Sequence, residues 1–144
     1  MTLDQKHDPE NIFAKIIHGD IPSVKLDESD DILAFMDVFP QSEGHCLVIH
    51  KRATATNIFD VDDDDLAVLI AAVRKIARAV KDGLKPDGVR IAQFNGAPAG
   101  QTVYHLHFHI IPVYEGRDLD RHASGGPADA EFLEKIAAKI RAAL

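Results

Sequence analysis

The chain has 144 residues, of which 46% are hydrophobic and 27% charged, and this balance predicts one folded domain over residues 1–144. A formal net charge of −7 argues against general binding to nucleic acid or anionic lipid, because such binding uses many Lys and Arg side chains to neutralise phosphates. The single cysteine, Cys46, cannot form an internal disulfide, and no apolar run approaches the roughly 20 residues of a membrane span. We therefore expect a cytoplasmic protein with no nucleic-acid and no membrane partner.

The first third of the chain predicts a short helix, a hairpin and a buried strand. Apolar residues recur with helical spacing over residues 12–17, and Gly19 follows as a helix stop. Over residues 23–38 apolar residues alternate on both sides of a polar turn at 27–31, which is typical of a β-hairpin. The compact apolar run at residues 45–50 contains β-branched residues and predicts a central strand.

The middle of the chain predicts a long helix that ends before Gly83, with an apolar stripe from Leu66 to Val80. Acidic residues at 60–65 precede it. We interpret them as the start of the helix, where its dipole stabilises acids, because the glycine and closing glutamate of a calcium loop are missing. Residues 89–94 predict a strand, residues 95–100 a loop, and residues 132–144 a closing amphipathic helix.

Three histidines alternate with apolar residues after that loop. Successive strand residues point to opposite faces, so His105, His107 and His109 should share one face, about 6.5 Å apart. The apolar residues between them would then anchor the sheet. The imidazoles would line a cleft beside the core, where one can attack a substrate, a second can orient it and a third can move a proton.

Three interpretations of the alternating histidines compete. They could be exposed surface residues, although strict alternation of a rare residue with apolar ones is not expected by accident. Two of them could bind zinc with a third ligand from elsewhere in the chain. The flanking loop favours the third interpretation, chemistry at phosphorus, since its backbone N–H groups and hydroxyl can hold phosphate oxygens. The residues concerned are Gly100, Gln101, Thr102 and Val103, with Asn95 as a further hydrogen-bonding side chain.

Residues 105–111, His-Leu-His-Phe-His-Ile-Ile, resemble the signature of the histidine-triad family, in which apolar residues separate three histidines. Other blocks resemble the remainder of that family in the same order, so the resemblance covers a core of about residues 11–112. It implies an α+β domain with an antiparallel sheet and a long helix, paired into a homodimer. The C-terminal tail and helix, residues 113–144, resemble bacterial members more than the shorter nucleoside phosphoramidase branch.

The resemblance also implies a hydrolase or transferase acting at the α-phosphorus of a purine nucleoside phosphoramidate or related nucleotide. His107 would be the nucleophile that forms a nucleotidyl-histidine, supported by His109, His105 and His45. Asp37 would accept hydrogen bonds from the ribose hydroxyls, unless it is a turn-starting acid. An apolar slot for the purine would be formed by residues that could equally be core: Ile12, Phe13, Phe35 and Val38.

Alternative functions are a dinucleoside polyphosphate hydrolase, a nucleotide-binding regulatory module with incidental turnover, and a metal-dependent hydrolase. We expect no cofactor and no metal. Some bacterial relatives hold structural zinc with four ligands, and three of those positions are here Asn11, Ala14 and Ala53.

The remaining histidines carry no predicted chemistry. His7, His18 and His122 lie in polar surroundings and are predicted to be surface residues, and we assign no catalytic role to His50.

Overall fold

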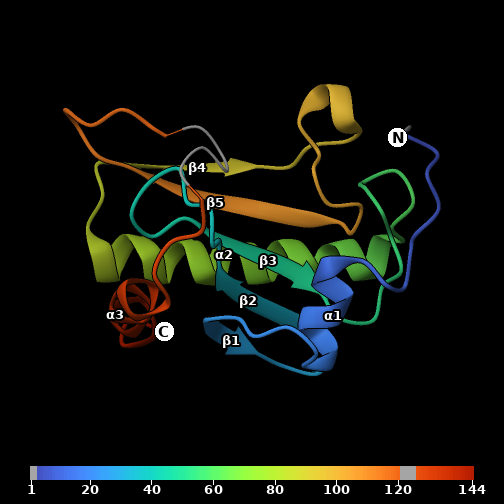
Figure 1. The fold of residues 1–144 in the computed structure, drawn as a ribbon, viewed down its shortest axis with the longest axis horizontal. Coiled ribbons are helices and arrows are strands. Elements are labelled where there is room, and N and C mark those ends of the chain that lie inside the picture. The colour runs from blue at the N-terminus through green and yellow to red at the C-terminus, as the bar shows by residue number, and fades with distance from the viewer. Residues whose placement is uncertain (1–2, 121–125) are drawn as a thin grey trace.

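The computed structural model describes residues 3–120 and 126–144, so the prediction for His122 lies outside the described residues. The described chain forms three α-helices and a five-stranded sheet in which all neighbouring strands are antiparallel (Figure 1). In spatial order the strands are β1 (Lys25–Glu28), β2 (Ile32–Met36), β3 (Cys46–His50), β5 (His107–Val113) and β4 (Gly88–Ala92). The predicted α+β class is confirmed, and no helix of the described residues is long and apolar enough to span a membrane.

Helices cover the two faces of this sheet unequally. The long helix α2 (Asp63–Leu84) and the closing helix α3 (Ala130–Arg141) share one core with the sheet residues Met36, Val48 and Phe108. On the opposite face, the short helix α1 (Ile12–His18) packs against β2 and β3 in a smaller core. The sheet is therefore closed by two helices on one side and left partly open on the other.

Strand register assigns the histidines to the partly open face. Val48 pairs with Phe108, and both belong to the core under α2 and α3. Because side chains alternate along a strand, their neighbours His107 and His109 point to the α1 side, opposite Ile49 and Leu47. The period-two prediction is confirmed for these two histidines.

The ends of the first two helices follow from their capping residues. Asn11 precedes α1 and its side-chain oxygen accepts a hydrogen bond from the Ala14 N–H at 2.9 Å, while Gly19 ends the helix at φ 84°. Asp62 caps α2 by accepting from the Asp65 N–H at 2.8 Å. The interpretation of the acidic cluster as a helix start is confirmed.

Gly83 is where the helix prediction was wrong. The sequence pattern ended the long helix before this glycine, whereas α2 continues to Leu84 and its cap is Lys85 at φ 52°. The reason is a close approach between helices: a Cβ at position 83 would lie 2.6 Å from the carbonyl oxygen of Lys139 in α3. Gly83 is thus a packing residue within the helix.

We predict that Gly83→Ala destabilises the protein. Alanine favours a helix interior by about 1 kcal/mol over glycine, but overpacking against the α3 backbone opposes this and typically costs about 1–3 kcal/mol. Urea unfolding should show a lower free energy of unfolding than wild type. Gly88→Ala is the matched control, because the nearest heavy atom to its Cβ is 4.0 Å away. A more stable Gly83→Ala protein would contradict the packing role.

Candidate active site

A cavity of about 290 Å³ opens on the α1 face of the sheet and brings together most of the predicted site. His107 and His109 line it, as do Asp37 and Thr102. Its walls are otherwise mainly apolar and include all four residues predicted for the purine slot, together with Val103: Ile12, Phe13, Phe35, Val38 and Val103.

The four slot residues differ in how far they are buried. Phe13 and Phe35 are buried and contact each other edge to face, with ring centroids 5.5 Å apart. Ile12 and Val38 are 48% and 41% exposed, so they are not core residues although they are apolar. Two aromatic rings thus form the inner wall of the cavity, while two aliphatic side chains reach solvent.

One hydrogen bond fixes the protonation pattern of His107. Its Nδ1 lies 2.7 Å from the backbone carbonyl oxygen of His105. A carbonyl can only accept, so Nδ1 of the neutral ring carries the hydrogen and Nε2 carries the lone pair. His107 is buried, 5% exposed, and its ring lies 5.0 Å from that of His109, centroid to centroid. The lone pair of the neutral His107 ring is thereby confined to Nε2.

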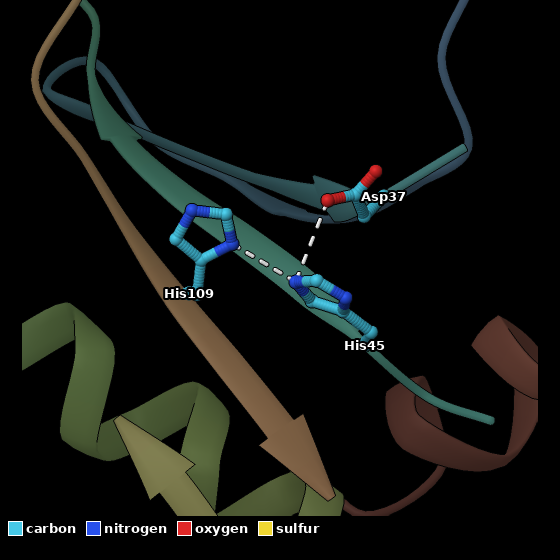
Figure 2. Close-up of side chains that lie close together, drawn as sticks. All are labelled: Asp37, His45 and His109. Carbon is cyan, nitrogen blue, oxygen red and sulfur yellow. Dashed lines mark hydrogen bonds and ion pairs between the residues drawn. The ribbon is translucent and has the colours of Figure 1, made fainter. Parts of the chain in front are cut away.

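A second chain of hydrogen bonds fixes His109 in the complementary pattern (Figure 2). The Gln41 N–H donates to Nδ1 of His45 at 3.0 Å, so the hydrogen of neutral His45 is on Nε2. That Nε2 lies 2.9 Å from Nδ1 of His109 and 3.4 Å from a carboxylate oxygen of Asp37. Donation from His45 to His109 Nδ1 leaves the hydrogen of His109 on its own Nε2. One imidazole of the cavity thus offers a lone pair and its neighbour offers a hydrogen.

The loop that orients His45 is itself held by the C-terminal tail. The Gln41 carbonyl accepts from the Asp120 N–H at 2.8 Å, and the Gln41 side chain donates to the Asp120 carbonyl at 3.1 Å. Farther along, the Ala128 N–H donates to the carbonyl of Val38 at 2.7 Å. The tail therefore braces the segment between Asp37 and His45, a contribution that the sequence pattern did not reveal.

His105 departs from the predicted arrangement. Strand β5 begins at His107, so His105 precedes it, and His105 does not line the cavity. It still lies on the α1 side as the alternation predicted, because Leu106 belongs to the core under α2 and α3 and the His105 ring lies 6.2 Å from that of Phe13, centroid to centroid. Its Nε2 lies 3.2 Å from the carbonyl oxygen of His50, and its Nδ1 is 3.2 Å from both His7 Nε2 and Asn11 Nδ2. The ring is directed to the N-terminal segment, and its backbone carbonyl is what contacts His107. His7, predicted to be a surface residue, is part of this contact.

The loop before the triad is held by its own side chains. Gln101 is 2% exposed; it accepts from the Gly96 N–H and donates to the carbonyls of Thr56 and Val103. The Asn95 side chain accepts from the Ile58 N–H at 3.0 Å and pairs with Gln93. Gly100 adopts φ 106°. These contacts shape the loop that carries Thr102 and Val103 to the cavity; direct nucleotide contacts by Asn95, Gly100 and Gln101 stay a prediction.

Within the described residues, Asp37, His45 and His109 form a group whose ligand atoms all lie within 4.8 Å of one another. The distances would suit a metal ion, but the hydrogen bonds do not. The Gln41 N–H occupies Nδ1 of His45, so a metal on Nε2 would require an imidazolate or the loss of that bond. The hydrogen bonds therefore favour a hydrogen on His45 Nε2 over a metal ion bound at that atom.

His50 has a structural role in this arrangement. Its Nδ1 accepts from the backbone N–H groups of Arg52 and Ala53, and its Nε2 lies 3.3 Å from an Asp65 carboxylate oxygen. The ring joins the turn after β3 to the start of α2. This agrees with leaving His50 out of the catalytic set.

The fold and site together define an α+β protein that presents paired imidazoles to an apolar ligand cavity. Comparison with known proteins agrees, since the family model described as HIT domain matches residues 18–116. A Bacillus subtilis protein named Protein hit is 46% identical over 109 residues, 75% of this chain and 74% of its own length. Adenosine 5'-monophosphoramidase hnt1 of Schizosaccharomyces pombe is 44% identical over 101 residues, 70% of this chain and 72% of its own.

A solved structure supports the same relationship along nearly the whole chain. A Hit-like protein involved in cell-cycle regulation from Bartonella henselae, crystallised with an unknown ligand, superposes with a TM-score of 0.87 at 51% sequence identity. The match covers 95% of this chain and 98% of that one. The chain belongs to the HIT, or histidine-triad, family, as its sequence signature predicted.

We predict that burial of His105 makes folding sensitive to acid. Loss of solvation lowers the pKa of His105 from its ordinary 6.5 to about 4. Between these values the unfolded chain binds the additional proton, so the free energy of unfolding falls as pH falls through this window, by about 3 kcal/mol in full. Urea unfolding at pH 7 and pH 4.5 measures the loss.

His105→Asn is the control for this titration, because the amide can donate and accept but does not titrate in this range. The variant should lose distinctly less stability than wild type between the two pH values. Equal losses in the two proteins would show that His105 does not contribute to the acid sensitivity.

Proposed function

We propose that this protein is a nucleotide hydrolase or transferase that acts at the α-phosphorus of a purine nucleoside phosphoramidate or a related nucleotide. The observation that carries the proposal is the pair of complementary tautomers in the cavity: His107 with its lone pair on Nε2 and His109 with its hydrogen on Nε2. The phosphoramidase named among the relatives supports the choice of substrate class.

In the proposed first step, Nε2 of His107 attacks phosphorus, and the bond from phosphorus to the leaving group breaks as the P–Nε2 bond forms. The ring becomes a nucleotidyl-imidazolium, whose Nδ1–H continues to donate to the His105 carbonyl. The hydrogen on His109 Nε2 stabilises negative charge where it develops, on the departing atom or the phosphoryl oxygens. The nitrogen of a phosphoramidate takes up a proton from solvent as its bond to phosphorus breaks, so it leaves as the neutral amine. In the second step water attacks phosphorus, the P–Nε2 bond breaks, Nε2 recovers its lone pair, and a proton of the attacking water passes to solvent.

In the proposed complex the nucleoside binds against the walls of the cavity. A purine fits between the aromatic inner wall and the two exposed aliphatic side chains, Ile12 and Val38. Asp37 lies at the end of β2 on the cavity wall, where its carboxylate can accept from the ribose hydroxyls. Both of its oxygens also have partners in the protein, Oδ1 the Phe39 N–H at 2.8 Å and Oδ2 the His45 Nε2 at 3.4 Å, and these contacts hold the carboxylate in place.

We predict that His107→Ala lowers turnover of adenosine 5'-phosphoramidate by at least about a thousandfold, because the nucleophile is removed. Binding of adenosine monophosphate, measured by calorimetry, should be largely retained, because the apolar walls and Asp37 remain. His18→Ala is the control, since this exposed residue ends α1 away from the site. Undiminished turnover in folded His107→Ala would exclude the nucleophile assignment.

The same assay separates the alternative functions within this family. Faster turnover of diadenosine polyphosphates than of phosphoramidates would identify a dinucleoside polyphosphate hydrolase. Tight product binding with negligible turnover of every leaving group would instead identify a regulatory nucleotide-binding module.

We also propose that the protein is a homodimer formed through β4. This strand ends the sheet, and in the described part of the chain no strand pairs with its outer edge. Ile91 on β4 is 46% exposed, and an exposed apolar edge strand is a ready surface for strand pairing. Sedimentation equilibrium should give twice the monomer mass, and Ile91→Lys should shift the protein toward monomer. A wild-type monomer at micromolar concentration would contradict the dimer.

A further inference from the structure

We propose that Asn11 and His7 are positioning residues for the nucleophile: they hold the ring of His105, whose backbone carbonyl in turn orients His107. Both residues lie before the segment matched by the family model, residues 18–116. The inference rests on the proposed role of His107, and it assigns a function to the N-terminal segment that precedes α1.

The first step concerns the nitrogen atoms of His105. Its Nε2 lies 3.2 Å from the His50 carbonyl oxygen, which can only accept, so Nε2 carries the hydrogen. The lone pair is therefore on Nδ1. His105 is 3% exposed, and a buried acceptor without a donor would weaken the arrangement.

Two nitrogen atoms from the N-terminal segment meet at that single lone pair: the Asn11 amide nitrogen, which donates, and His7 Nε2, which can donate when it carries the hydrogen of its ring. Asn11 Nδ2 and His7 Nε2 each lie 3.2 Å from Nδ1 of His105, and they lie 3.2 Å from each other. The orientation of the Asn11 amide is fixed, because its oxygen accepts from the Ala14 N–H and its nitrogen also donates to the Asp8 carbonyl. Because a single lone pair needs only one strong donor, either residue can donate to His105 Nδ1 when the other is replaced.

The contacts of the His105 ring matter because the backbone of this residue lies outside the sheet. It precedes β5, so the sheet ladder does not hold its backbone, although the next residue donates its N–H to the Ala55 carbonyl. The His105 carbonyl is nevertheless the group that accepts from His107 Nδ1 at 2.7 Å. The ring contacts therefore hold the backbone of His105 as well, and without them a shift of this backbone would move the carbonyl and no longer confine the hydrogen of His107 to Nδ1.

Asn11 contributes to the site by a second route. It caps α1, the helix that carries Phe13, and the Phe13 ring lies 5.0 Å from the His107 ring and 6.2 Å from the His105 ring, centroid to centroid. A substitution at this position must therefore preserve the cap if it is to test the contact with His105. Serine does so, because it is about as good an N-cap as asparagine.

The test is a double-mutant cycle with Asn11→Ser and His7→Phe, which removes the donor but keeps a ring. Because the two donors substitute for each other, each single variant should keep kcat for adenosine 5'-phosphoramidate within about threefold of wild type, whereas the double variant should lose roughly tenfold or more. KM should change little, because neither residue lines the cavity. Leu3→Ala is the matched control from the same segment.

A second measurement separates positioning from loss of structure. In the nucleotide-free protein, ¹⁵N-edited spectra of the histidine side chains should show His105 with hydrogen on Nε2 and His107 with hydrogen on Nδ1. The double variant should show a mixture of His107 tautomers in a protein that is somewhat less stable but still unfolds cooperatively above the assay temperature. If no nucleotide is turned over even by wild type, the proposed function fails, while these spectra still decide whether the two residues hold His105.

Three results would overturn the positioning role. One is wild-type kcat in the double variant, and another is a loss of kcat in the double variant no larger than the product of the two single losses. The third is a loss of kcat with the His107 hydrogen still confined to Nδ1, since the residues would then act by some other route.

Discussion

The hydrogen bond from His107 Nδ1 to the His105 carbonyl, 2.7 Å long, is the constraint on which the site depends. It confines the hydrogen of the neutral His107 ring to Nδ1 and leaves the lone pair on Nε2, the atom that acts as the nucleophile in the proposed mechanism. A ring free to exchange tautomers would spend part of its time with a hydrogen on the attacking atom. The fixed carbonyl removes that state before any substrate is bound, which is preorganisation of the reacting group.

Contacts from a different part of the chain give the neighbouring His109 the opposite tautomer, with its hydrogen on Nε2. The Gln41 N–H determines which nitrogen of His45 carries hydrogen, and His45 determines the same for His109. Two backbone groups, the Gln41 N–H and the His105 carbonyl, thus set two imidazoles in complementary patterns 5.0 Å apart. Backbone dipoles serve this purpose well, because they do not titrate and are held by the surrounding loops.

The sequence predicted the elements of this arrangement better than their contacts. Alternation correctly assigned His107 and His109 to the face opposite Phe108, because period two is a local property of a strand. It did not reveal that the His105 ring lies outside the cavity, against His7 and Asn11, because those contacts join segments far apart in sequence. Gly83 was misjudged for a related reason: the neighbouring backbone that requires a glycine comes from α3.

Contacts of the two ends of the chain could not be inferred from local pattern. His7 sits among polar residues yet contacts His105, and Asp120 lies in a polar tail yet holds Gln41. Such residues carry no periodicity, so only the folded chain shows what they touch. Both ends of the described chain thus support the same group of histidines from outside the cavity.

The most direct test of the account is a crystal structure of the protein trapped after reaction with a nucleoside phosphoramidate. The account predicts phosphorus bonded to Nε2 of His107, with Nδ1 still within hydrogen-bonding distance of the His105 carbonyl. Phosphorus bonded to any other atom, or to Nδ1 of the same ring, would contradict it.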